Sequence, residues 1–270
     1  MLDGLINWLS DLPTIFAVLV ALVGGGVLSA SGLLVVHRLL SHGVRSAHND
    51  ISGSILGIVG VIYAVLLAFI AVAVWQNFGQ ADKLVQTEAN LVGDLYQDTA
   101  AFPDPAASDL RHYLYVYAGI VEQDEWPSMA AGHPQEAAGW QLLNRFHAEL
   151  VQFHTQDDGV AVMQADMVRT LNLLYDARRG RFHEATANLP AIIWWNLIIG
   201  AVILMIFTYL FGVPRLLMHV AMVSLLGALI SLVLVLIVLL NNPFRGDNRV
   251  SVEPFNRLAQ SVEGMGYPHP

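Results

Sequence analysis

Histidine, cysteine and acidic side chains are the residues that most often bind metals or carry out catalysis, and their spacing here favours neither. The chain has ten histidines and no cysteine. His147 and His154 are spaced by about two helical turns and share a helix face, and His37, His42 and His48 gather in one short segment. No His-x-x-x-His or Glu-x-x-His pair stands at the spacing of metal ligands on a helix. We interpret the histidines as solvated or core residues and predict no metal site and no cofactor.

The glycines and serines do not form a known phosphate-binding or nucleophile motif. Gly24, Gly25 and Gly26 are consecutive, but no Lys-Ser or Lys-Thr pair follows them, so the run indicates helix packing rather than a phosphate loop. The chain has no Gly-x-Ser-x-Gly sequence. No carboxylate pair is placed in an identifiable cleft. The sequence therefore predicts a protein that is not an enzyme.

Polar residues that follow a long apolar stretch are better candidates for a site. Gln76, Gln80 and Glu88 come after an uncharged segment that ends at Trp75, and they could line a polar vestibule. The alternative for Glu88 is a solvated helix face or a salt bridge to a later helix.

Three arginines precede another apolar segment and leave two interpretations open. Arg178, Arg179 and Arg181 either touch anionic lipid head groups or pair with Glu88 and Asp94.

The composition is that of an integral membrane protein. The mean hydropathy is +0.54, and only 13% of the residues are charged, against about 25% in a soluble domain. The net charge of −9 argues against a nucleic-acid partner, which requires clustered lysine and arginine. Residues 1–13 lack a basic residue, so we do not interpret them as a signal peptide.

Four apolar segments predict an all-α protein with four transmembrane helices and a helical extramembrane domain. We expect spans at about 12–36 and 51–75 in an N-terminal hairpin (1–75), and at about 191–211 and 218–240 in a C-terminal hairpin (189–240). Residues 76–188 show helical periodicity and predict the extramembrane domain, with a loop at 122–134. The tail, 241–270, carries four prolines and is expected to be extended.

The second apolar segment organises the chain. Nothing interrupts its helical pattern, so we predict one helix of roughly 50 residues that continues to about residue 100. At 100° per residue it has two different faces, and small residues on one of them favour close packing. The small residues are Gly53, Gly57, Gly60, Ala64, Ala68 and Ala71; the opposite face carries Ile55, Ile58, Ile62, Leu66, Phe69 and Ala73.

Basic residues near the membrane indicate the orientation. The side that holds the large domain carries Lys83, Arg178, Arg179, Arg181, Arg245, Arg249 and Arg257, and the other side carries Arg38, Arg45 and Arg215. The positive-inside rule then places the domain in the cytoplasm, although the basic first hairpin opposes this. We predict a multi-pass protein of the bacterial inner membrane with a cytoplasmic domain.

Residues 63–78, YAVLLAFIAVAVWQNF, carry a resemblance to a known family: an aromatic residue, a small apolar run that ends in Phe, then a Trp and a polar exit. The chain resembles bacterial bestrophin-like proteins. The further residues that carry the resemblance are Asn49, Asp50, Gly60, Glu88, Ala89, Pro190, Trp194, Asn242, Pro243, Phe244 and Gly246.

The resemblance implies a homo-oligomer, expected to be a pentamer, that conducts ions passively through a narrow apolar neck lined by the second helix. It places the neck at Ile62, Tyr63, Leu66 and Phe69. The sequence has no acidic cluster like the calcium clasp of animal bestrophins, so calcium gating is not implied. Self, membrane lipid and inorganic ions are the expected partners.

Two functions remain open at this point. A passive channel explains the two faces of the second helix and the absence of Asp, Glu, Lys and Arg from the spans, which lowers the case for an active transporter. A non-conducting scaffold or sensor, anchored by the same spans, is the alternative. The acidic domain would favour cations in a channel.

Overall fold

The computed structural model describes residues 2–39 and 49–264, all of which belong to helices or their connections, with no strand. The chain divides into two compact units. Unit 1 comprises Met1–Gln76, Asn188–Asn242 and Gly246–Asn248; unit 2 comprises Asn77–Ala187, Pro243–Arg245 and Arg249–Pro270. Each has its own packing. Arg45, His42 and His48 of the predicted basic hairpin lie outside the described residues.

Unit 1 contains the helices that are long and apolar enough to cross a membrane. They are α2 (Thr14–Leu39), the first part of α4 (Asn49–Asp98), α9 (Ala191–Tyr209) and α10 (Leu216–Asn241), preceded by a short α1 (Leu2–Asp11). By length and composition these are four candidate spans, in agreement with the four predicted. The all-helical fold class is confirmed.

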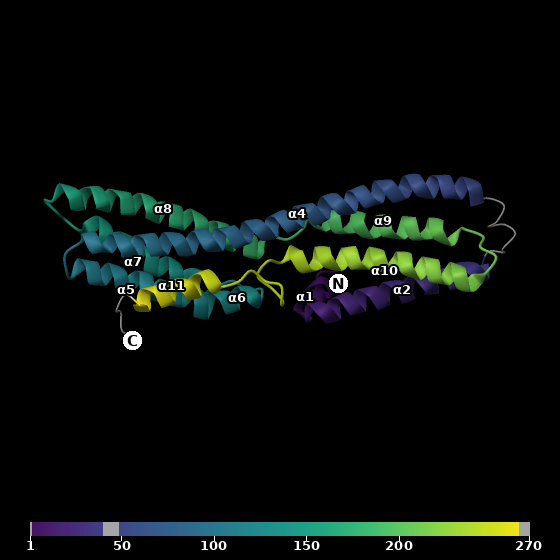
Figure 1. The fold of residues 1–270 in the computed structure, drawn as a ribbon, viewed down its shortest axis with the longest axis horizontal. Coiled ribbons are helices and arrows are strands. Elements are labelled where there is room, and N and C mark those ends of the chain that lie inside the picture. Colours follow the sequence, from purple (N-terminus) through teal and green to yellow (C-terminus); the bar gives the residue numbers. More distant parts are fainter. Residues whose placement is uncertain (1, 40–48, 265–270) are drawn as a thin grey trace. The chain divides into compact units, whose positions relative to one another are not determined.

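Helices α2 and α10 run side by side and make the closest contact in unit 1 (Figure 1). A Cβ added at Gly25 would lie 2.8 Å from the carbonyl oxygen of Gly227, and one added at Gly227 would lie 2.8 Å from the carbonyl oxygen of Gly25. Either methyl group would also collide with a hydroxyl, that of Ser231 or Ser29 respectively. The sequence indicated helix packing at the run Gly24, Gly25 and Gly26, and the structure identifies α10 as the partner of Gly25.

Asparagine side chains form hydrogen bonds at the ends of helices in unit 1. The Asn49 side-chain amide donates to the carbonyl oxygen of Gly212 at 3.2 Å and accepts from the Gly212 amide at 2.9 Å, so the start of α4 is joined to the α9–α10 connection. At the other end of α10, Asn241 Oδ1 accepts from the Leu189 amide at 3.0 Å. These bonds satisfy backbone groups that a helix end leaves without partners.

Helix α4 is one uninterrupted helix of 50 residues, as the periodicity predicted. A 3-10 turn, Thr99–Ala101, ends it; Phe102 follows, and then Pro103, whose ring cannot continue a helix. Its first part belongs to unit 1 and its second part to unit 2.

Unit 2 is a helical bundle around one apolar core. Its other elements are α5 (Ala106–Ile120), the π-helical turn η2 (Val121–Glu125), α6 (Trp126–Ala130), α7 (Ala137–Gln152), α8 (Asp158–Thr186) and α11 (Glu253–Gly264). Asp157 caps α8, since its side chain accepts from the amides of Gly159 and Val160. Tyr117, Phe146 and Leu150 are completely buried in the core.

Two sequence-based expectations about unit 2 were wrong. Much of the predicted 122–134 loop is helical, because Trp126 and Met129 are buried in the core and hold that segment in place. The tail is not extended throughout: α11 starts beside Pro254, which is tolerated in a first helical turn, and it packs Phe255 and Val262 into the core. The prolines were therefore a misleading signal.

The glycine run offers a matched test of the α2–α10 contact. Gly25→Ala should destabilise the protein by about 1–3 kcal/mol, because its methyl group meets backbone as well as the Ser231 side chain. Gly24→Ala is the control, since nothing lies within 4 Å of a Cβ at that position. The check is the apparent melting temperature of the purified protein in detergent. Equal melting temperatures for the two variants would contradict the crossing described here.

Candidate functional site

Most of the predicted site residues lie on α4, and the structure separates the four neck candidates among them into two groups. Tyr63 is buried, and its hydroxyl donates to the carbonyl oxygen of Leu197 on α9 at 2.9 Å. Its ring lies so close to Gly200 that a Cβ there would be 2.6 Å away. Tyr63 therefore packs against α9 within the subunit and does not share the surface of the other three neck candidates.

Ile62, Leu66 and Phe69 lie on an accessible face of α4. Ile62 is 65% exposed and Phe69 is 72% exposed, while Leu66 is half-buried. At 100° per residue these three positions fall within a narrow stripe of the helix. Gln76 and Gln80 are also exposed and fall close to the same stripe. The structure thus keeps an apolar stripe followed by two amides on one side of α4.

The small residues of α4 are only partly covered within the subunit. A Cβ at Gly53 would contact the Phe211 ring, and one at Gly60 would contact Leu204, each at 3.8 Å. Nothing lies within 4 Å at Gly57, and Ala64 and Ala68 are exposed.

Four small residues of α4 form one wall of an apolar groove. Gly60, Ala64, Ala68 and Ala71 of α4 line it on one side, and Leu226, Leu229, Ile230 and Val233 of α10 line it on the other. Close packing of this face is therefore incomplete in one subunit.

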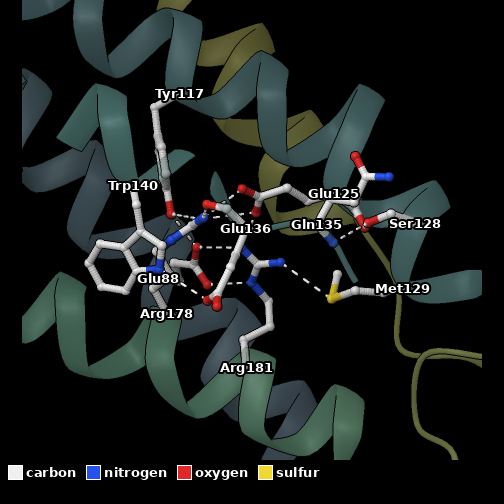
Figure 2. A network of polar contacts seen from close by, with 10 residues as sticks. All are labelled: Glu88, Tyr117, Glu125, Ser128, Met129, Gln135, Glu136, Trp140, Arg178 and Arg181. Atoms are coloured by element: carbon white, nitrogen blue, oxygen red, sulfur yellow. Dashed lines mark hydrogen bonds and ion pairs between the residues drawn. The ribbon is translucent and has the colours of Figure 1, made fainter. Parts of the chain in front are cut away.

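Glu88 lies in unit 2 and belongs to a buried cluster of charges (Figure 2). Arg181 donates from Nε to Glu88 Oε2 at 2.6 Å and from a terminal nitrogen to Glu88 Oε1 at 2.9 Å. The same terminal nitrogen donates to Glu125 Oε2 at 2.7 Å. Of the alternatives for Glu88, the structure shows the salt bridge, and the Glu88 side chain has no exposed surface.

Arg178 pairs with the other side of Glu125. Its two terminal nitrogens donate to Glu125 Oε1 at 2.6 Å and Oε2 at 2.9 Å, a bidentate geometry that suits a guanidinium group. One of them also donates to the carbonyl oxygen of Glu136 at 2.9 Å. Two arginines and two glutamates, each at most 1% exposed, are thus gathered with no net charge.

Tyr117 connects the two ion pairs. Its hydroxyl donates to Glu88 and accepts from Arg178 at 3.0 Å. Burial, together with the charge of Glu88, raises the pKa of the Tyr117 hydroxyl well above its ordinary value, so it stays protonated and keeps donating. Burial disfavours the charged form of Arg181, but the charge of Glu88 and its hydrogen bonds outweigh this and raise the pKa of Arg181.

Aromatic rings enclose the two guanidinium groups. The Phe182 ring centroid lies 4.9 Å from Arg178 Cζ and 4.7 Å from Arg181 Cζ, and Trp140 lies 5.2 Å from Arg178 Cζ. Such faces attract a cation that has lost its water. Backbone comes equally close: a Cβ at Gly139 would lie 2.5 Å from Arg178 and would overlap Glu125. The cluster is closed, and it holds α4, α7, α8 and the η2 turn together.

Sequence reasoning found part of this cluster. It offered pairing with Glu88 as one of two choices for the arginines, but Glu125 and Tyr117 were missed. Arg179 is different from its neighbours, because it is 60% exposed and pairs with Asp176. A signal was present: the buried stripe of α8 runs through Met167, Leu171, Leu174, Arg178 and Arg181, which places both arginines at core positions.

The described residues contain no group of three histidine, cysteine, aspartate or glutamate side chains that could hold a metal ion. His154 is exposed, and its Nδ1 lies 2.6 Å from the carbonyl oxygen of Gln152, which is a local contact at the end of α7.

The cluster can be tested by removing one charge. Glu88→Gln leaves two buried guanidinium groups facing one carboxylate, so we expect a loss of about 3–5 kcal/mol of stability. Arg179→Gln is the control on the same helix; its exposed pair with Asp176 should contribute less than about 1 kcal/mol. The measurement is again the apparent melting temperature. If Glu88→Gln has the same melting temperature as Arg179→Gln, the ion pair between Glu88 and Arg181 does not stabilise unit 2.

Comparison with known proteins agrees with this architecture. A family model described as the Bestrophin-like domain matches residues 26–255. A crystal structure of a bacterial bestrophin homolog from Klebsiella pneumoniae, solved as a variant, is similar with a TM-score of 0.64 and 16% identity, covering 93% of this chain and 99% of that one.

A crystal structure of a membrane protein, also a variant, has a TM-score of 0.65 and 16% identity over 95% of this chain and 99% of its own. No curated protein matches the chain. At this level of identity, the two crystal structures establish a shared fold.

Proposed function

The chain belongs to the family of Bestrophin-like domains, and on this basis we propose that it is a membrane-embedded passive ion channel built from several copies of itself. A pentamer is the assembly we propose, with α4 of each subunit around a common axis. The protein has no catalytic activity in this proposal. The observation that carries it is the stripe of large apolar side chains that α4 leaves accessible.

The accessible stripe supports a neck made of Ile62, Leu66 and Phe69. Copies of these side chains around an axis would form rings of apolar groups, and such constrictions exclude water and gate ion flow. Tyr63 is not part of the proposed neck, because its ring and hydroxyl are engaged by α9. An uncharged neck also fits a passive protein whose predicted apolar segments, 12–36, 51–75, 191–211 and 218–240, contain no Asp, Glu, Lys or Arg.

The groove lined by Gly60, Ala64 and Ala68 supports contact between subunits. Small side chains allow the backbone of a neighbouring helix to approach closely, and in lipid such packing is a main source of helix association. The packing predicted for Gly53, Gly57, Gly60, Ala64 and Ala68 would then be completed by a second copy.

Gln76 and Gln80 support a polar vestibule after the neck. Both amides are exposed, uncharged and able to donate and accept hydrogen bonds to hydrated ions. Glu88 is not included, because its carboxylate is buried and fully used by Arg181 and Tyr117.

Neck residues can be tested by flux from liposomes that contain the purified protein. Leu66→Ala combined with Phe69→Ala should raise the rate of ion release severalfold, because smaller side chains widen and wet the constriction. Leu217→Ala combined with Leu225→Ala is the matched control, since both leucines are exposed and lie on α10, outside the helix proposed to line the neck. No release from the wild type or the neck variant would favour a non-conducting scaffold instead.

The orientation we propose places unit 2 in the cytoplasm of a bacterial cell. The connection between α7 and α8, at residues 154–157, is a suitable site for a protease of broad specificity, because it is largely exposed and contains no proline. Protease added to intact spheroplasts should leave this connection uncut, and lysed spheroplasts should be cut there. Cleavage from outside would reverse the orientation. Arg178 and Arg181, two of the basic residues counted in favour of a cytoplasmic unit 2, form buried ion pairs and do not reach the membrane surface.

A further inference from the structure

Lys83 is the only lysine in the chain, and it stands on the accessible side of α4. We propose that Lys83 forms a ring of positive charge around the ion path and makes the channel prefer anions. This inference rests on the proposed channel function and adds to it the residue that selects the ion.

The position of Lys83 follows from the register of the helix. Counting in sevens from Ile55 gives Ile62, Phe69, Gln76 and Lys83, and all five side chains are exposed. A stripe that repeats every seven residues faces one axis when several helices supercoil around it with a left-handed twist. If Ile62 and Phe69 face the axis, Lys83 does so two heptads beyond Phe69, about 21 Å further along the helix.

The charge of Lys83 is not cancelled by its own helix. The residues three and four positions away, where a carboxylate would pair with it, are Gly79, Gln80, Gln86 and Thr87. Among the described residues, no ion pair involves Lys83. Asp82 precedes it, but its carboxylate accepts a hydrogen bond from Gln86 at 2.7 Å. Within the part of the chain that the structure describes, the Lys83 side chain is therefore exposed on this stripe without an ion-pair partner.

Asp94 is the other exposed charged residue on this side of α4, and its surroundings differ. Together with Arg257 of α11 it lines a polar groove between α4 and α11, so a guanidinium group faces the same space. Lys83 does not belong to the lining of that groove. Lys83 is thus the charge next to the polar end of the proposed neck, and Asp94 shares its space with a charge of opposite sign.

The preference for anions runs against the chain's overall charge. A net charge of −9 would by itself attract cations to the protein. Charges far from the ion path are screened over roughly 8–10 Å at physiological salt, whereas a ring of lysines acts directly on each passing ion. The local ring should therefore decide the selectivity.

The test is the reversal potential of the reconstituted wild-type protein in a KCl gradient across a planar bilayer. Wild type should prefer chloride, and Lys83→Glu should lower the chloride-to-potassium permeability ratio by about tenfold or more. Arg169→Glu makes the same charge change on α8, a helix that does not line the proposed ion path, at a side chain that is 73% exposed, and should leave the ratio unchanged.

A cysteine variant adds a rescue, because the natural chain has no thiol. Lys83→Cys should lose the chloride preference, and treatment with aminoethyl methanethiosulfonate should restore it by placing an ammonium group at the same position. The sulfonatoethyl reagent, which adds a negative charge, should instead favour potassium. An unchanged ratio in all of these forms, with flux still present, would overturn the inference and leave the channel function standing.

A second measurement does not depend on flux. A flexible bis-maleimide should cross-link Lys83→Cys subunits into covalent dimers, because a ring brings the five positions together and each subunit has a single thiol. Arg169→Cys should give monomers only. Absence of flux in every form would remove the channel function, and absence of cross-linking at position 83 would remove the ring by itself.

Discussion

A guanidinium group that is cut off from water must be paired, and this constraint governs unit 2. Arg178 and Arg181 sit at core positions of α8, so two carboxylates and a tyrosine hydroxyl have to reach them. Glu88 comes from α4 and Glu125 from the π-helical turn. The irregular turn therefore has a reason: it carries a carboxylate to a position from which it contacts both arginines.

Unit 1 is stabilised by the opposite means. Among its described residues the helices carry no charged pair in their apolar parts, and α2 and α10 approach so closely that neither Gly25 nor Gly227 has room for a methyl group. In lipid there is little hydrophobic gain from bringing helices together. Van der Waals contact between small residues therefore has to supply the free energy of helix association. The same reasoning makes the uncovered small residues of α4 a natural place for a second subunit.

Several features could be predicted from single residues or short patterns. The four spans follow from hydropathy and length, and the length of α4 follows from an unbroken helical period that ends at Pro103. Prediction failed where distant parts of the chain meet. Tyr63 was assigned to the neck by the family resemblance, which does not reveal that its side chain packs against α9. The prolines of the tail led to the prediction of an extended segment where α11 forms. The apolar face of α11 is buried only because it packs on the core of unit 2.

The sequence by itself determined the class of protein, the number of spans and the family resemblance, since these depend on local hydropathy, periodicity and short motifs. Tertiary structure decided which side chains are free to act. It buried Glu88 among two arginines and a tyrosine, and it left Ile62, Phe69 and Lys83 accessible on α4. The physical reason is that burial and charge pairing depend on which helices pack together, and helices far apart in the chain leave no local mark of their partners.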